Sequence, residues 1–204
     1  MKALGINGSH RRGGHTSKML DLVLEVIQTA DVETELLELT EFNIRRCVAC
    51  NRCLRNPECS IQDDDMALLA EKMEAADAII IGSPVYFCSV TSLLKTFMDR
   101  TRWMHMHRNP LDGKIGAALT HAALRNGGQE LTQIVIERFL LAHGLYVVEA
   151  RENGFPRYNL GPMGTLFDSL EGDTIRWKKG PLDDELTVRM CRILGRKILE
   201  KLDI

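Results

Sequence analysis

Four of the six cysteines in this chain lie close together, in the segment CVACNRCLRNPEC. They follow the spacing C-x2-C-x2-C-x5-C and are Cys47, Cys50, Cys53 and Cys59. Disulfides within so short a segment would close only small loops and would stabilise the fold little. In a reducing compartment, clustered thiols are more often metal ligands or redox groups. The segment therefore predicts a metal centre or a redox site.

The intervals between these cysteines favour a cluster over a single ion. Zinc knuckles usually pair two CxxC units across a longer segment, so that two turns approach the ion from opposite sides. Three cysteines at successive intervals of three match iron–sulfur ligation better, because each thiolate then reaches a different iron. Cys59 is near enough to complete the same cluster. We therefore predict one [4Fe-4S] cluster; structural zinc and thiol redox chemistry are the alternatives.

A second group of polar residues lies in the loop GSHRRGGHTS, at 8–17. Its glycines allow a sharp turn that presents N–H groups to an anion, and a predicted helix begins at the same place. The loop matches neither the P-loop nor GxGxxG. We predict a phosphate site here, the alternative being an ordinary Gly/Ser-rich connection. Its expected donors are the hydroxyls of Ser9, Thr16 and Ser17, with positive charge from Arg11 or Arg12.

These groups need a scaffold, and the sequence supplies strands that alternate with helices. Such alternation indicates an open parallel sheet with helices on both faces, an α/β architecture. Five strands fit a flavodoxin-like three-layer sandwich with the order 2-1-3-4-5, in which strand 2 lies near an edge. Short apolar runs predict these strands at 3–9, 32–39, 77–87, 114–122 and 145–150.

The whole chain, 1–204, is predicted to form a single domain. A cluster segment, 45–62, follows strand 2, and an extension of loop and helix occupies 151–204. The loop part of this extension, 151–181, either covers a site or interface or is a surface excursion without chemistry. Because the cluster segment leaves from the carboxyl edge of the sheet, we expect it to share one side of the molecule with the phosphate loop.

Two further loops leave the carboxyl edge beside the point where the strand order reverses, which is where open sheets of this kind bind ligands. SPVYF, at 83–87, has a stiff Pro and aromatic side chains that suit a flat ring. HAALRNGGQE, at 121–130, has glycines that permit close backbone approach. Together with the phosphate loop they predict FMN. Its ring-side contacts are expected from Pro84, Val85, Tyr86, Phe87, Asn126, Gly127 and Gly128.

Composition limits the class of partner. Lys and Arg total 26 and Asp and Glu 28, so the charge is nearly balanced and gives no reason to expect nucleic acid. MKALGINGSH has no signal-peptide apolar run, and no segment reaches the length of a membrane span. We expect a cytoplasmic protein without a membrane partner.

The three loops, as GSHRRGGHTS, SPVYFCSVTSLLKTFMDR and GGQE, resemble the motifs of the NAD(P)H-dependent FMN reductase superfamily over roughly 1–150. The resemblance implies that Ser9, Arg11, Thr16 and Ser17 hold the FMN phosphate and that 84–87 and 127–128 hold the isoalloxazine. The superfamily often has Pro at the position of His10 and Asn at that of His15, so His15 is expected to contribute its backbone N–H.

With the cysteine motif added, the chain resembles the iron–sulfur flavoproteins. That family implies one [4Fe-4S] cluster and one FMN per subunit, with electrons passing from ferredoxin through the cluster to FMN and on to O2 or H2O2. It also implies a homodimer or homotetramer in which a cluster can serve a neighbouring subunit's FMN. Four arginines near the cysteines favour docking of an acidic donor, the alternative being solvated surface charges: Arg45, Arg46, Arg52 and Arg55.

Two other enzyme or carrier functions remain open at this point. One is an NAD(P)H-dependent FMN or quinone reductase whose cysteines hold zinc, and the other is a non-catalytic electron carrier or redox sensor. Three features are assigned no chemistry: Cys88 is expected to be a small buried residue, Cys191 to pack inside the last helix, and WMHMHR, at 103–108, to form a loop or subunit contact.

Overall fold

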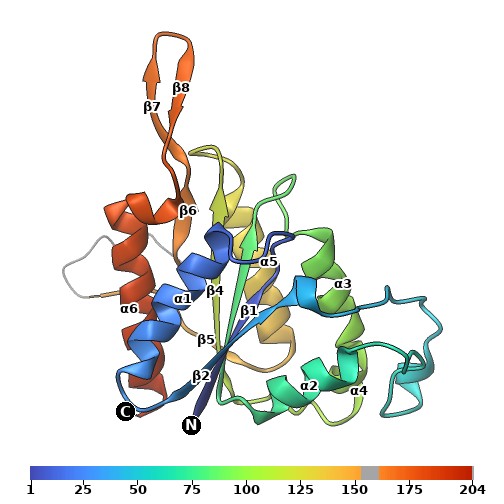
Figure 1. The fold of residues 1–204 in the computed structure, drawn as a ribbon. Coiled ribbons are helices and arrows are strands. Elements are labelled where there is room, and N and C mark those ends of the chain that lie inside the picture. Colours follow the sequence, from blue (N-terminus) through green and yellow to red (C-terminus); the bar gives the residue numbers. More distant parts are fainter. Residues whose placement is uncertain (153–160, 204) are drawn as a thin grey trace.

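A parallel sheet forms the centre of the chain in the computed structural model, which describes residues 1–152 and 161–203 (Figure 1). The strands are ordered β2-β1-β3-β4-β5, and each neighbouring pair is parallel. This confirms the predicted flavodoxin-like order and the edge position of β2. The bounds are β1 (Lys2–Asn7), β2 (Glu33–Glu38), β3 (Ala78–Pro84), β4 (Ile115–Ala122) and β5 (Tyr146–Val147).

The outer edge of β4 is shared by two short strands, of which the sequence predicted only the first, β5. β5 pairs only with Ile115 and Gly116, and β6 (Met163–Thr165) pairs with the other end of β4, at Thr120 to Ala122. The strand predicted at 145–150 is therefore too long. After Val147 the chain leaves the sheet, and Val148 becomes part of the apolar core on one of its faces.

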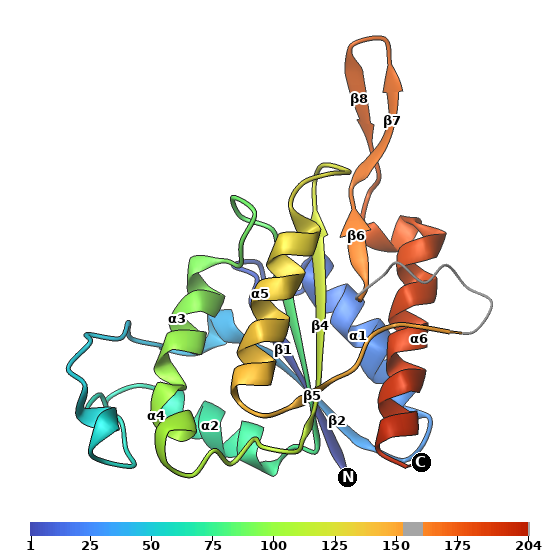
Figure 2. The same ribbon diagram turned by 180° about the vertical axis from the view of Figure 1, so that it is seen from behind.

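Helices cover both faces of the sheet, as Figures 1 and 2 show. α1 (His15–Gln28) and α6 (Glu185–Lys201) cover one face. The Asp184 side chain caps α6 by accepting a hydrogen bond from the Thr187 N–H at 2.9 Å. The other face carries α2 (Met66–Ala75), α3 (Ser92–Arg100), α4 (Arg102–His107) and α5 (Gln129–Ala142). Among the described residues, no helix is both long and apolar enough to cross a bilayer.

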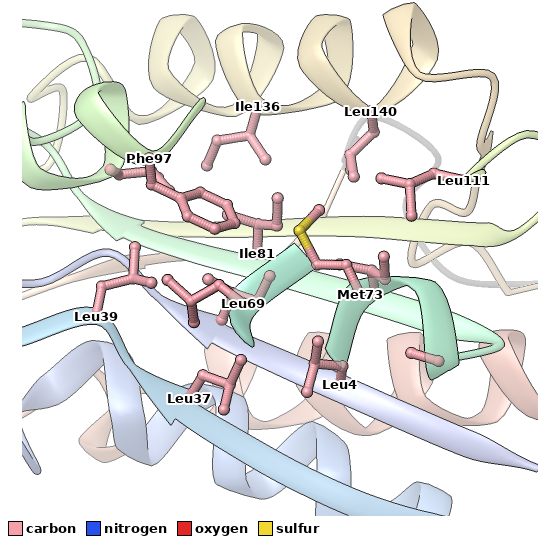
Figure 3. Close-up of a cluster of buried hydrophobic side chains, with 14 of the residues drawn as sticks. Leu4, Leu37, Leu39, Leu69, Met73, Ile81, Phe97, Leu111, Ile136 and Leu140 are labelled. Carbon is pink, nitrogen blue, oxygen red and sulfur yellow. The ribbon is translucent and has the colours of Figure 1, made fainter. Parts of the chain in front are cut away.

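The core is divided into two clusters by the sheet, because successive side chains of a strand point to opposite faces. Figure 3 shows the cluster on the α2 and α5 side, where Ile81 lies among Met73, Phe97 and Ile136. The second cluster packs between the sheet, α1 and α6. It includes Cys191, which is fully buried, so the prediction that Cys191 is a packing residue is confirmed.

A β-hairpin replaces much of the predicted loop at 151–181. β7 (Phe167–Glu171) and β8 (Thr174–Trp177) pair antiparallel and project beyond the carboxyl edge of the sheet (Figure 1). Gly172, with φ of +58°, lies in the two-residue turn between them. A short 3₁₀ helix, Pro181–Asp183, then leads into α6. The part of the predicted loop at 153–160 lies outside the described residues.

Candidate functional site

The four clustered cysteines line one hollow, together with residues from the end of α3 and from α4. The backbone reaches this shape through left-handed turns at Ala49, with φ of +52°, and Asn51, with φ of +56°, followed by one 3₁₀ turn at Arg52–Leu54. Asn tolerates this conformation better than most residues. The non-cysteine side of the hollow includes Asp99, Arg100, Arg102 and Trp103.

α4 holds the cysteine segment in place with two side chains. His107 Nε2 donates to the Cys53 carbonyl oxygen at 2.9 Å, and Arg102 Nη1 donates to Asn51 Oδ1, also at 2.9 Å. The interpretation of WMHMHR as a loop is therefore wrong. These residues form a helix, and its polar side chains contact the segment that carries the thiols.

A buried ion pair joins the same segment to α3. Arg100 Nη1 binds the Asp64 carboxylate, and both side chains are only 1% exposed. Arg100 also donates to the carbonyl oxygens of Arg45, at 2.6 Å, and Ile61, at 3.3 Å, while Asp64 accepts from the Arg45 N–H at 3.0 Å. Since Arg45 precedes the cysteines and Ile61 follows them, this pair fixes both ends of the segment.

The charges of this pair are reinforced by their surroundings. Burial raises the pKa of the Asp64 carboxyl, but hydrogen bonds from Arg100 and from two backbone N–H groups outweigh burial, so the pKa is lowered. Burial lowers the pKa of Arg100, but the hydrogen bond to Asp64, the interaction with the nearby Cys59 side chain and the charge of Asp64 raise it by more. Both partners are therefore ionised at neutral pH, and the Cys59 side chain is close enough to Arg100 to affect its pKa.

The thiol of one cysteine, Cys50, has a lowered pKa. The Ser60 hydroxyl lies 3.0 Å from Cys50 Sγ, and this hydrogen bond lowers the pKa of the thiol, with a smaller contribution from the Arg52 N–H. The thiolate is the form that binds metals. Four cysteines that line one hollow, one of them with a lowered thiol pKa, fit a group that needs sulfur ligands.

The cysteine hollow lies away from the phosphate loop, contrary to the expected shared side. α3 begins beside the carboxyl edge of the sheet, whereas the hollow is lined by its last residues, Asp99 and Arg100, and by α4. In Figure 2 the segment emerges beside the middle of α3 and extends to the side of α4. The expectation is wrong because Arg100, at the far end of α3, anchors the segment there.

A second pocket, of about 180 Å³, opens at the carboxyl edge between the phosphate loop and the loop after β3. The structure brings six of the residues predicted for FMN together in it. It also adds Leu166, which precedes the hairpin, and three residues at and just after the end of β4. The six predicted residues are Ser9, Arg11, His15, Pro84, Val85 and Tyr86, and the three added by β4 and the following loop are His121, Ala122 and Ala123.

Two residues predicted to hold phosphate point into the protein instead of lining this pocket. Thr16 and Ser17 are almost fully buried. Ser17 Oγ donates to the Glu38 carboxylate, which also accepts from the Gly13 N–H at 3.1 Å and from Asn7 Nδ2 at 2.6 Å. The buried carboxylate thus fixes the shape of the loop. The sequence did not single out Asn7 or Glu38, because each is an ordinary strand-end residue until the loop folds over it.

The remaining predicted ring contacts lie outside the pocket lining. Phe87 is fully exposed, and Asn126 and Gly128 line a neighbouring hollow with Met163. Gly128 has φ of +95°, and a Cβ there would lie 2.7 Å from Cys88 Sγ, so the two ring-side loops touch at this point. Gly127, beside it, donates its N–H to Gln129 Oε1 at 2.8 Å. Cys88 itself is exposed, so its predicted burial is wrong.

His121 is a pocket residue to which sequence reasoning gave no role. It is 8% exposed, its Nε2 lies 3.2 Å from Thr16 Oγ1, and its ring centroid lies 5.6 Å from that of His15. Burial, with a smaller contribution from His15, lowers the pKa of His121 to about 4. The imidazole is therefore neutral at pH 7. Its place at the end of β4, facing the phosphate loop, is the signal that would have identified it.

Comparison with known proteins agrees with this geometry. By fold, the chain is a flavodoxin-like protein: it superimposes with a TM-score of 0.60 on a flavodoxin from the domain Archaea, at 18% identity and with full coverage of both chains. The structure of RosB with a bound flavin intermediate gives a TM-score of 0.74 at 16% identity, covering 100% of this chain and 79% of that one.

The NADPH-dependent FMN reductase family matches residues 1–159. An iron–sulfur flavoprotein from Methanocaldococcus jannaschii is 36% identical over 98% of this chain and 96% of its own. One from Archaeoglobus fulgidus is 32% identical over 98% and 94%. The chain therefore belongs to the iron–sulfur flavoproteins of the NADPH-dependent FMN reductase family, and it is an FMN-dependent oxidoreductase.

The buried ion pair yields a stability prediction. Asp64→Asn leaves Arg100 as a buried charge without its counterion, so we expect the free energy of unfolding to fall by about 3–5 kcal/mol. The matched control is Asp63→Asn, the same change at the preceding, 71% exposed carboxylate that pairs with Arg45, for which we expect a loss of about 0–1 kcal/mol. Urea unfolding followed by circular dichroism measures both. Equal losses would contradict the assigned role of Asp64.

His121 yields a pH prediction. Its folded pKa lies below the value in the unfolded chain, so the unfolded state binds more protons below about pH 6.5 and the stability from His121 is lost as pH falls towards 4. In His121→Gln, the decrease in unfolding free energy between pH 7 and 4.5 should be smaller by about 2 kcal/mol. The exposed His10→Gln is the control and should match the wild type. A decrease in His121→Gln as large as that of the wild type would refute the assignment.

Proposed function

We propose that this chain carries one FMN and one [4Fe-4S] cluster, and that it moves electrons from a reduced carrier, ferredoxin, through the cluster to FMN and on to O2 or H2O2. The observation that carries the proposal is the single hollow lined by Cys47, Cys50, Cys53 and Cys59. Relatives over nearly the whole chain are named iron–sulfur flavoproteins, which supports the same assignment.

The arrangement of the thiols favours a cluster over zinc. A zinc ion needs its four ligands to converge within about 2.3 Å of one point. Three cysteines at successive intervals of three, with a fourth close behind them in the same hollow, are better matched to a cubane, in which each thiolate binds a different iron.

The pocket at the carboxyl edge is the proposed FMN site. Ser9 and Arg11, with the N–H groups at the start of α1, would hold the phosphate, because the helix N-terminus favours an anion there. Pro84, Val85 and Tyr86 would line the ring. Flavin supplies the electron-transfer chemistry when bound, and these residues supply its position and electrostatic environment.

The donor is proposed to be acidic because the exposed surface around the hollow is basic. Arg46, Arg52 and Arg55 are exposed. Arg45 is already paired with Asp63 and contributes less net charge. A basic patch of this kind steers an acidic partner such as ferredoxin towards the cluster.

A homodimer or homotetramer is proposed because the two sites lie at opposite ends of α3 within one chain. In an assembly, the cysteine hollow of one subunit can approach the flavin pocket of another. The short transfer path would then run between subunits, and sedimentation of the loaded protein tests for that assembly.

A second candidate is an NAD(P)H-dependent FMN or quinone reductase. It is favoured by the description of the family and by 31% identity over 197 residues to an NAD(P)H dehydrogenase (quinone) from Chromohalobacter salexigens. Membership of an enzyme family argues against the third candidate, a non-catalytic carrier or sensor.

Anaerobic stopped-flow reduction separates the two enzyme candidates. The proposal expects flavin bleaching to be faster with reduced ferredoxin than with NADPH, followed by reoxidation with added H2O2. Rapid bleaching by NADPH with none by ferredoxin would instead show that the protein is an NAD(P)H-dependent reductase.

The basic patch gives a testable prediction. Reversing Arg46 and Arg55 to Glu should slow reduction by ferredoxin about tenfold at low salt, and the difference should shrink as salt screens the charges. The control reverses Arg192 and Lys201, on α6 at the other face of the sheet. Stopped-flow rates across a salt series measure the effect. An unchanged rate in the Arg46/Arg55 variant would refute docking at this patch.

A further inference from the structure

Two buried N–H groups without acceptors lie beside the cysteine hollow. They are Arg100 Nε and Trp103 Nε1, and within the described ranges neither has a hydrogen-bond partner. Both side chains line the hollow together with all four clustered cysteines. Arg100 is only 2% exposed. Unlike a histidine nitrogen, these two atoms always carry hydrogen and can act only as donors.

A buried N–H group without an acceptor lowers the free energy of unfolding, so an acceptor is expected for each of these two groups. Buried N–H groups are nearly always hydrogen-bonded, and the indole N–H usually finds an acceptor when it is buried. The other nitrogens of the Arg100 guanidinium are bound to Asp64, Arg45 and Ile61, which fixes the plane of the group. Its Nε–H is therefore held rigidly in one direction, and the nearby Cys59 side chain is among the groups that raise the pKa of Arg100.

The chemistry of the hollow indicates what the acceptor is. A cation would be repelled by the Arg100 guanidinium, whereas thiolate and sulfide sulfurs are anionic acceptors. Hydrogen bonds to the sulfurs of an iron–sulfur cluster stabilise its reduced, more negative form and so raise its reduction potential.

We propose that Arg100 Nε–H and Trp103 Nε1–H donate hydrogen bonds to sulfur atoms of the group held by the four cysteines and raise its reduction potential. This inference rests on the proposed [4Fe-4S] cluster. It assigns to Arg100 and Trp103 the role of making the cluster easier for the donor to reduce.

Trp103→Phe tests the proposal, because it removes the N–H and keeps an aromatic ring in the same place. In an EPR-monitored redox titration of the loaded protein, the ratio of reduced to oxidised cluster at a fixed ambient potential should fall about fivefold, which is the loss of one hydrogen bond. Trp177→Phe makes the same chemical change at an exposed residue of β8 and should titrate as the wild type does.

A second readout detects the hydrogen bonds themselves. With nitrogen-15 at tryptophan Nε1 or arginine Nε, pulsed EPR of the reduced cluster should show a nitrogen coupling in the wild type and in Trp177→Phe. The tryptophan coupling should vanish in Trp103→Phe. A merely structural role for Trp103 would not produce that coupling.

Failure of this inference is distinguishable from failure of the proposed function. Wild-type protein that lacks iron and acid-labile sulfide would overturn the cluster itself, before any variant is made. A loaded wild type with no coupling from either nitrogen, or an unshifted titration in Trp103→Phe, would overturn the hydrogen bonds and leave the cluster in place. An equal shift in Trp177→Phe would also overturn them, since the effect would then not be local.

Discussion

The ion pair between Arg100 and Asp64 determines where the cysteine segment lies. The segment has few apolar side chains and no strand or α-helix, and without this pair it would be held against the domain mainly by the hydrogen bonds from Arg102 and His107. The guanidinium binds a carboxylate and two carbonyl oxygens that lie on either side of the four thiols. Because both charged groups are buried, removing either one would leave the other as an unpaired buried charge and would destabilise the fold.

This anchoring divides the protein into two sites with different supports. The flavin pocket is built from loops at the carboxyl edge of the sheet, and the buried Glu38 carboxylate fixes the phosphate loop from beneath. The cysteine hollow is built at the other end of α3 and is held by side chains of α3 and α4. A sheet with this strand order can bind its ligand at the reversal point while its outer helices carry a second redox group.

The sequence was sufficient for β1 to β4, because their apolar runs and the alternation of strands with helices fit a flavodoxin-like order, but it overestimated β5 and missed β6. It was also sufficient to collect the four cysteines, whose spacing alone keeps them together. It placed them on the same side as the phosphate loop, at the carboxyl edge of the sheet. That was wrong because their position depends on the pair Arg100 and Asp64, which are 36 residues apart in the sequence. The same limit explains His121 and the exposure of Cys88, which depend on how separate loops meet, and the hairpin, whose short strands carry little apolar signal.

The central claim is that the cysteine hollow holds one [4Fe-4S] cluster in a flavoprotein. The most direct measurement is iron, acid-labile sulfide, zinc and FMN content of protein purified without oxygen, with an EPR spectrum after reduction. The account predicts about four irons and four sulfides with one FMN per chain, and the signal of a reduced cluster. Stoichiometric zinc without sulfide would contradict it and would make the cysteine segment a structural clip on a flavin reductase.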